Sequence, residues 1–219
     1  MKRTILFFSF FALSAFMLHL SAQDAAVIKL NDHCKYRGFN IMEAFQKRSS
    51  TNAYQSRDLS LQDLSDLLWA ANGINRPESG KKTAPSAMNS QDVDIYVSRA
   101  DGTYLYDAAA NSLVRITSDD LRPLMEGRRP LGAPVILLLV SDMARYKSYT
   151  PGDPVKNKHL YEMGAIDAGI VSQNIALFCA GVELGTRPRA GMDQDALRKA
   201  LQLKESQVAW LNHPVGYPQ

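Results

Sequence analysis

Three short segments combine side chains that could bind a phosphate group or a flat ligand. The first, residues 47–52 (KRSSTN), places two cations beside four small hydrogen-bonding side chains. Guanidinium and hydroxyl groups suit the oxygens of a phosphate. A solvent-exposed helix end with capping residues has the same composition, so this segment alone leaves both interpretations open.

The second segment, residues 81–90 (KKTAPSAMNS), surrounds a proline with small residues. Such a loop lets the backbone approach a flat ligand, although a surface loop leading into a strand at Val93 would look the same. The third segment, residues 185–189 (GTRPR), again joins small residues to arginines. The sequence lacks G-x-S-x-G, Walker and G-x-G-x-x-G motifs and a zinc-like histidine spacing, so serine-hydrolase, P-loop, Rossmann and zinc functions find no support.

The N-terminus is typical of a secretory signal. Lys2 and Arg3 precede an apolar stretch over residues 5–20, which ends in the small residues Ser21 and Ala22. This pattern predicts a signal peptide over residues 1–22 and a periplasmic protein, with an uncleaved anchor as the alternative. Cleavage would leave 197 residues (219 − 22) with 23 cations (25 − 2) against 22 acids. A nearly neutral chain gives no reason to expect nucleic-acid binding.

Residue patterns predict a polar arm over residues 23–40 and one domain over residues 41–219. We expect a helix over residues 41–47, and a second over residues 61–71 that Ser60 caps and Gly73 ends. A loop is expected over residues 76–82. Alternating residues then predict antiparallel strands near residues 93–97, 104–106 and 113–116, and a short helix toward Met125 capped by Ser118 or Asp119. The apolar run 134–140 predicts a central strand covered on both faces.

The second half contains one long apolar helix, expected over residues 160–180. Its many small residues suit either a subunit interface or close internal packing. Cys179 in this run is expected to be a buried free thiol, although export would permit a disulfide with Cys34. A short helix from Asp193 and a last strand over residues 207–211 follow. Helices and strands do not alternate regularly, so the predicted fold class is α+β, a mostly antiparallel sheet flanked by helices.

Taken in order, these segments resemble the FMN-dependent nitroreductase family, and within it the branch of the thiazoline/oxazoline oxidases that mature peptide toxins. The resemblance covers residues 41–219 and rests on five blocks. These are residues 48–52 (RSSTN), 60–74 (SLQDLSDLLWAANGI), 83–87 (TAPSA), 163–186, which form the long helix and its glycine loop, and 214–218 (PVGYP).

The resemblance implies an FMN-binding homodimer in which the flavin performs the chemistry and no side chain acts as a nucleophile or metal ligand. The implied cofactor-binding residues are Arg48, Ser49, Ser50 and Asn52 for the phosphate and ribityl chain, Pro85, Ser86, Ala87 and Met88 against the ring, partly from the other subunit, Gly164 and Ala165 near flavin N5, and Gly185, Thr186 and Arg187 in the glycine loop. The backbone N–H groups at Gly164 and Ala165 are expected at the start of the long helix.

Two departures from the family pattern concern the phosphate end. Asn52 stands where a second arginine is usual, and no basic residue follows the PVGYP block, so Arg187 or Arg189 is a candidate substitute. Hydride would pass through flavin N5 between a donor and an acceptor, with a small molecule or a peptide as substrate. NAD(P)H is a possible donor, but export would separate the protein from that pool. The alternative hypothesis is an exported flavin-binding or non-catalytic binding protein with the same fold.

Overall fold

A computed structural model of the chain describes residues 27–127 and 129–219, so the predicted signal peptide lies outside the described residues. Seven strands form one sheet in the order β1-β6-β5-β4-β7-β9-β8, and each pair of neighbours is antiparallel. The strands are β1 (Val27–Lys29), β4 (Val93–Arg99), β5 (Gly102–Asp107), β6 (Ser112–Thr117), β7 (Val135–Asp142), β8 (Gly185–Thr186) and β9 (Gln207–Gly216). The predicted α+β class is confirmed.

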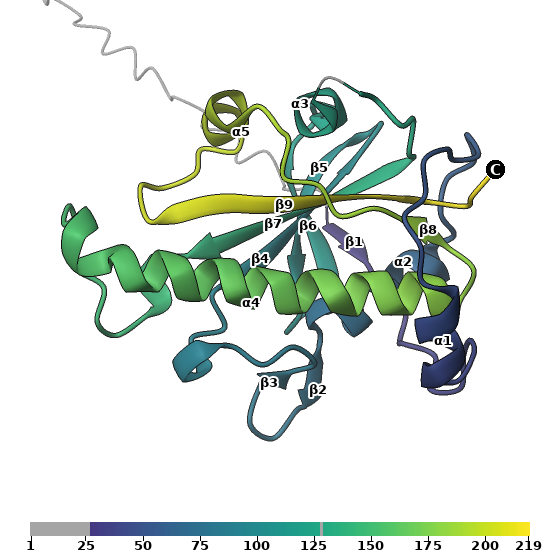
Figure 1. Cartoon of the computed structure of the whole chain (residues 1–219), viewed down its shortest axis with the longest axis horizontal. Helices are drawn as coiled ribbons and strands as arrows, with labels where there is room; N and C mark the ends of the chain where they lie inside the picture. Colours follow the sequence, from purple (N-terminus) through teal and green to yellow (C-terminus); the bar gives the residue numbers. More distant parts are fainter. Residues whose placement is uncertain (1–26, 128) are drawn as a thin grey trace, which may run out of the picture.

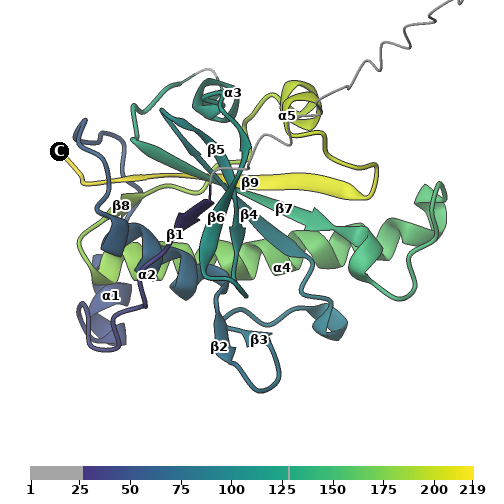
Figure 2. The same ribbon diagram turned by 180° about the vertical axis from the view of Figure 1, so that it is seen from behind.

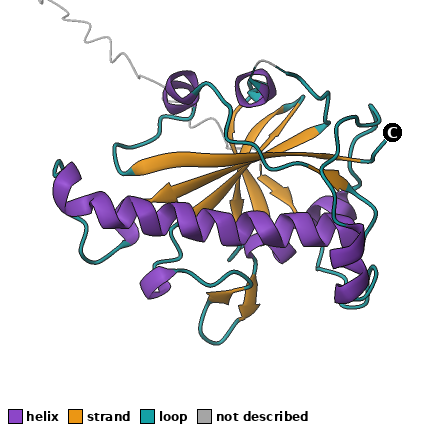
Figure 3. Cartoon of the chain, viewed as in Figure 1, coloured by secondary structure: helices purple, strands orange, loops and turns teal. Residues whose placement is uncertain are grey.

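Helices cover both faces of the sheet (Figures 1 and 2). On one face lie α2 (Leu61–Asn72) and α4 (Pro154–Gly181), with α1 (Ile41–Lys47) at the C-terminal end of α4. The shorter α3 (Arg122–Glu126) and α5 (Gln194–Ala200) cover the other face, as Figure 3 shows.

Strand β7 is central because its side chains pack on both sides. Leu137 and Leu139 belong to the core cluster under α2 and α4, whereas Ile136 and Leu138 belong to the cluster under α3 and α5. Every residue of β7 is buried, as the continuous apolar run predicts.

Local capping signals set the ends of the first two helices. The Ser60 side chain accepts a hydrogen bond from the Asp63 backbone N–H (3.0 Å), and Gly73 is the C-cap of α2. Both predictions are confirmed, as is the helix over residues 41–47. The predicted cap of α3 is wrong. Its N-cap is Leu121, whose backbone N–H donates to the buried Ser98 hydroxyl (3.2 Å), and the Arg122 N–H in the first turn donates to the Asp120 carboxylate (3.0 Å).

Three other boundaries differ from the expectations. Helix α4 begins at Pro154, with the Asp153 side chain as N-cap, instead of near residue 160. Residues 74–82 form a small hairpin of β2 (Ile74–Arg76) and β3 (Lys81–Lys82) where a loop was expected. Strand β9 continues past residue 211 to Gly216, because Pro214 pairs with Ile136 of β7.

The arm before α1 packs on α2. Strand β1 pairs with β6, and the His33 ring stacks on the Trp69 ring with centroids 3.7 Å apart. The Arg37 guanidinium bridges the carboxylates of Asp63 and Asp66, two residues of α2 that are largely buried. Cys34 lies exposed on this arm, Cys179 is buried in α4, and both are free thiols.

Candidate cofactor site

The first and third candidate segments meet at the C-terminal end of α4. The Thr51 backbone N–H donates to the Thr186 carbonyl (3.0 Å), and the Arg187 guanidinium donates to the Asn52 side-chain oxygen. The two chains approach so closely that a Cβ at Gly185 would lie 2.7 Å from the Thr51 side chain. Residues about 135 positions apart in sequence therefore form one surface.

A cavity of about 260 Å³ opens on this surface. Its lining includes Lys47, Ser49 and Thr51 from the first segment, Thr186 from the third, and Ala176 and Ala180 from α4. The side chains of Arg48, Ser50 and Arg187 are exposed beside it. Cations and hydroxyls around an open cavity are a suitable donor set for a phosphate, with the Glu183 carboxylate in the lining as the opposing charge. These residues fit the phosphate end of a mononucleotide.

Thr186 is oriented from inside the core. It is 4% exposed, and its hydroxyl shares a hydrogen bond with His213 Nδ1 (3.2 Å). The other ring nitrogen, Nε2, lies 2.8 Å from the Ser172 hydroxyl on α4. Burial lowers the pKa of His213 to about 3, so the ring is neutral. The Thr186 hydroxyl therefore helps to position the loop, and its predicted contact with the cofactor stays a prediction.

The second candidate segment lies farther along α4. The Ala87 backbone N–H donates to both carboxylate oxygens of Asp167, at 2.9 and 3.1 Å. Pro85 and Met88 are exposed, and Ser86 accepts a hydrogen bond from the Gln91 N–H (2.8 Å). From Asp167 to Cys179, which lines the phosphate cavity, α4 advances twelve residues, or roughly 18 Å at 1.5 Å per residue. Within one protomer the second candidate segment is thus well separated from the first and third.

Gly164 and Ala165 do not lie at a helix start. Because α4 begins at Pro154, their N–H groups fall well beyond the first turn, where N–H groups are left free. The expected position at the start of the helix is therefore wrong, whereas the proximity to flavin N5 that the family resemblance implies stays a prediction. A Cβ at Gly164 would lie 2.5 Å from the Met143 methyl, and the Ser141 hydroxyl donates to the Gly164 carbonyl (3.0 Å). This glycine lets α4 approach the end of β7.

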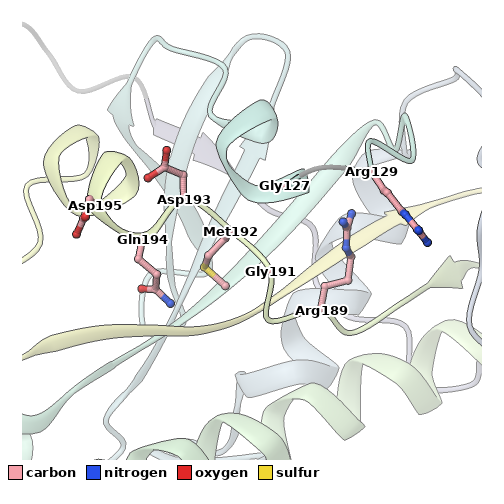
Figure 4. A pocket seen from close by; sticks show the side chains of 8 residues that line it. All are labelled: Gly127, Arg129, Arg189, Gly191, Met192, Asp193, Gln194 and Asp195. Atoms are coloured by element: carbon pink, nitrogen blue, oxygen red, sulfur yellow. The ribbon is translucent and has the colours of Figure 1, made fainter.

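The side chain of Arg189, the last residue of the third segment, points away from the cavity that Thr51 and Thr186 line. Its guanidinium donates to the Glu126 carbonyl at the end of α3, and it lines a separate cavity of about 750 Å³ with Arg129 and Asp193. Figure 4 shows the Arg189 side chain pointing toward Gly127 and Arg129. Of the two arginines considered as substitutes at the phosphate end, only Arg187 reaches Asn52.

Comparison with known proteins agrees with this geometry. The nitroreductase family profile matches residues 45–217. A relative from Methanocaldococcus jannaschii that is named as a nitroreductase is 29% identical over 182 residues, covering 78% of this chain and 87% of the relative. A crystal structure from Ralstonia eutropha, also named as a nitroreductase, is 30% identical with a TM-score of 0.80, and 88% of this chain and 90% of that chain align.

Two more distant structures share the fold. The Escherichia coli microcin synthetase complex with a truncated pro-microcin bound contains a chain with a TM-score of 0.68 and 16% identity, covering 96% of this chain and 85% of that one. An NADPH:FMN oxidoreductase from Vibrio harveyi in complex with NAD⁺ has a TM-score of 0.61 and 18% identity, covering 83% and 70%. At these identities the likeness concerns the fold alone.

Proposed function

The chain belongs to the nitroreductase family, and from this premise we propose that it is an FMN-dependent oxidoreductase that works as a homodimer. The observation that carries the proposal is the meeting of residues 47–52 with residues 185–187 around a cavity whose polar lining is one cation, Lys47, three hydroxyls and the Glu183 carboxylate. FMN would supply the redox chemistry, taking hydride from a donor and passing it to an acceptor. The side chains of this protein bind and orient it.

The phosphate end would be held by Arg48, Ser49, Ser50 and Arg187. In our proposal Arg187 provides the charge that Asn52 lacks, because its guanidinium lies against the Asn52 amide. The carboxylate of Glu183 in the same cavity disfavours a second anion there. The site would therefore accept one phosphate group.

The exposed face of α4 supports a two-subunit site. Between Met163 and Val182 the only charged residue is Asp167, which is buried, so the exposed face carries Ile166, Gly169 and Gln173 and no charge. A Cβ at Gly169 would meet nothing within 4 Å, so packing within the protomer does not require glycine there. Gly in a helix interior costs about 1 kcal/mol relative to Ala, and a closely approaching second helix would account for it.

A two-fold axis across this face would complete the site. The point halfway between Asp167 and Cys179 is Gln173. We call residues 85–88, which Asp167 holds through Ala87, the ring-binding segment, and residues 47–52 and 185–187 the phosphate segments. If two α4 helices cross antiparallel near Gln173, the ring-binding segment of one protomer lies next to the phosphate segments of its partner. We propose this arrangement, in which each flavin site draws residues from both subunits.

Our proposal for the electron donor and the substrate rests on the predicted location of the protein. With the predicted signal over residues 1–22 the protein would work in the periplasm, away from cytoplasmic NAD(P)H. We propose that the electrons come instead from a small-molecule or peptide substrate that the enzyme dehydrogenates. The fold likeness to the microcin synthetase chain makes a peptide a reasonable first substrate class to assay.

FMN titration of the purified protein tests the proposal. We expect a yellow protein whose flavin absorbance is bleached by dithionite and restored by air. Arg48→Ala and Arg187→Ala should each raise the Kd for FMN at least tenfold, the loss expected from removing one charge-assisted contact of about 1.5–3 kcal/mol. Arg129→Ala, an exposed arginine at the other cavity, is the matched control and should leave the Kd unchanged. A colourless protein that takes up no FMN would refute the proposal.

A further inference from the structure

Two aspartates are buried beside each other under the ring-binding segment. Asp92 precedes β4 and is 0% exposed, and Asp167 on α4 is 2% exposed. Both contact the segment 87–90, because Asp167 accepts from the Ala87 N–H and Asp92 accepts from the Ser90 hydroxyl, and the Asp167 carboxyl is close enough to help raise the pKa of Asp92. Neither takes part in any ion pair found among residues 27–127 and 129–219. Two adjacent carboxylates in such a setting cannot both be charged.

The hydrogen bonds of the two carboxyl groups are unequal. Asp167 accepts from the Ala87 N–H and from the Tyr146 hydroxyl (2.9 Å). Asp92 Oδ1 accepts from the Ser90 hydroxyl (2.9 Å), whereas its Oδ2 finds no partner among the described residues. Hydrogen bonds from donors favour the charged form of a carboxyl group. We therefore place the proton on Asp92 Oδ2, which can donate it to Asp167. A protonated Oδ2 that donates to Asp167 would account for the absence of another partner at this oxygen.

The surrounding charges do not neutralise a second carboxylate. Arg145 is the nearest cation, but its guanidinium binds Asp94 (2.6 and 2.7 Å) and the Gln91 carbonyl (2.7 Å). The other groups facing the pair are Lys82 from β3, Asp142 from β7 and Tyr146 from the following turn. Burial and the neighbouring Asp167 raise the pKa of Asp92 to about 6.

The same two aspartates hold the ends of a strained loop. Met88, Asn89 and Gln91 all have positive φ angles (53°, 52° and 49°), a conformation that costs an L-residue about 1–2 kcal/mol each. Such a loop keeps its shape only where its surroundings impose it. Asp167 binds the loop at Ala87, and Asp92 binds it at Ser90, so these contacts flank Met88 and Asn89, while Gln91 lies next to Asp92 in the chain.

We propose that Asp92 and Asp167 share one proton and act as positioning residues, fixing residues 86–91 in the shape that presents Pro85 to Met88 to the flavin. This inference rests on the proposed function for the identity of the ligand. The shared proton itself is a property of the protein without ligand. The two parts can therefore be tested separately.

Urea unfolding of the ligand-free protein between pH 4 and pH 7 tests the shared proton. The pKa of Asp92 is raised in the folded state, so proton binding to Asp92 stabilises the fold. This stabilisation is fully present below pH 3.8, the usual pKa of an aspartate, and is lost as the pH rises through about 6. Relative to Asp92→Asn, the wild-type unfolding constant should rise on the order of 100-fold over this range, from a shift of about two pKa units. Asp101→Asn, in an exposed turn, is the control and should follow the wild type. A pH-independent difference between wild type and Asp92→Asn would overturn the shared proton.

FMN affinity tests the positioning role. Asn at position 92 can still donate to Asp167, so Asp92→Asn should bind FMN within about twofold of the wild type. Asp167→Ala removes the acceptor of the Ala87 N–H and should weaken binding more than tenfold. Should Asp167→Ala fail to fold, Ser90→Ala cuts only the Asp92 end of the loop and should weaken binding severalfold. Unchanged affinity in both variants would overturn the positioning role, whereas a wild type that binds no FMN would refute the proposed function and leave the proton test standing.

Discussion

A buried neutral histidine makes the fold sensitive to acid. His213 is 0% exposed, and its ring nitrogens are engaged with Thr186 and Ser172. Burial lowers its pKa from 6.5 to about 3, so the unfolded chain binds a proton that the folded protein excludes. The contribution of this group to stability is present above pH 6.5 and is lost as the pH falls toward 3. Between pH 7 and pH 5 the loss is about 2 kcal/mol.

The assay is urea unfolding of wild type and His213→Gln at pH 7 and pH 5. Glutamine cannot become charged, so the variant should lose about 2 kcal/mol less than the wild type between these pH values, whatever its stability at pH 7. His159→Gln, an exposed histidine on α4, is the matched control and should behave as the wild type. The Asp92 proton acts in the opposite direction over this range but is present in all three proteins, so it cancels in the comparison. Equal losses in wild type and His213→Gln would refute the reasoning.

Two further predictions concern the subunit interface and the N-terminal arm. Gly169→Glu should convert the proposed dimer into a folded monomer on size exclusion, because a side chain at this position meets nothing within the protomer; a variant that remains dimeric would place the interface elsewhere. Arg37→Ala removes the cation between the carboxylates of Asp63 and Asp66 and should lower the free energy of unfolding by about 2 kcal/mol. This loss is smaller than the roughly 3–5 kcal/mol typical of breaking a fully buried ion pair, because the Arg37 side chain is a quarter exposed. The melting temperature should then fall by about 5 °C while that of Lys35→Ala, an exposed residue of the same arm, stays at the parent value.

Local signals were sufficient for much of the fold. The Ser60 cap, the Gly73 stop and the alternation over β4 each depend on neighbours within a few residues, and each was readable from the sequence. The start of α4 was also encoded locally, as Asp153 followed by Pro154, a common N-cap and first-turn pair. It was missed because Pro151 and Gly152 just before it favour a loop.

Features that depend on distant partners could not be predicted in this way. Strand β1 has three residues and forms only because β6 offers an edge. Trp69 is half-buried, and its ring is covered by His33 of the arm, 36 positions earlier in the chain. The backbone N–H of Leu121, the N-cap of α3, donates to a hydroxyl 23 residues away, on Ser98 of β4.

In the candidate site, too, some features could be predicted from the sequence and others depend on distant contacts. The resemblance named the segments, but only the structure brings residues 47–52 to residues 185–187 and leaves residues 85–88 on Asp167. Asp167 did carry a signal in the sequence, as the only charge in a run of twenty residues. Its partner Asp92 carried none, because a single aspartate before a strand is common and the two residues are 75 positions apart.

Mixed dimers test the central claim, a flavin site shared between two subunits, most directly. One parent carries Arg48→Ala with Arg187→Ala, and the other carries Met88→Trp, which places a bulky side chain on the exposed ring-binding segment. Neither parent should bind FMN as a homodimer. The co-expressed heterodimer is purified through two different tags. If each flavin site draws on both subunits, one of its two sites carries both defects and the other site carries none. We therefore expect about one FMN per heterodimer. A heterodimer that binds no FMN, beside a wild type that binds two, would contradict the account.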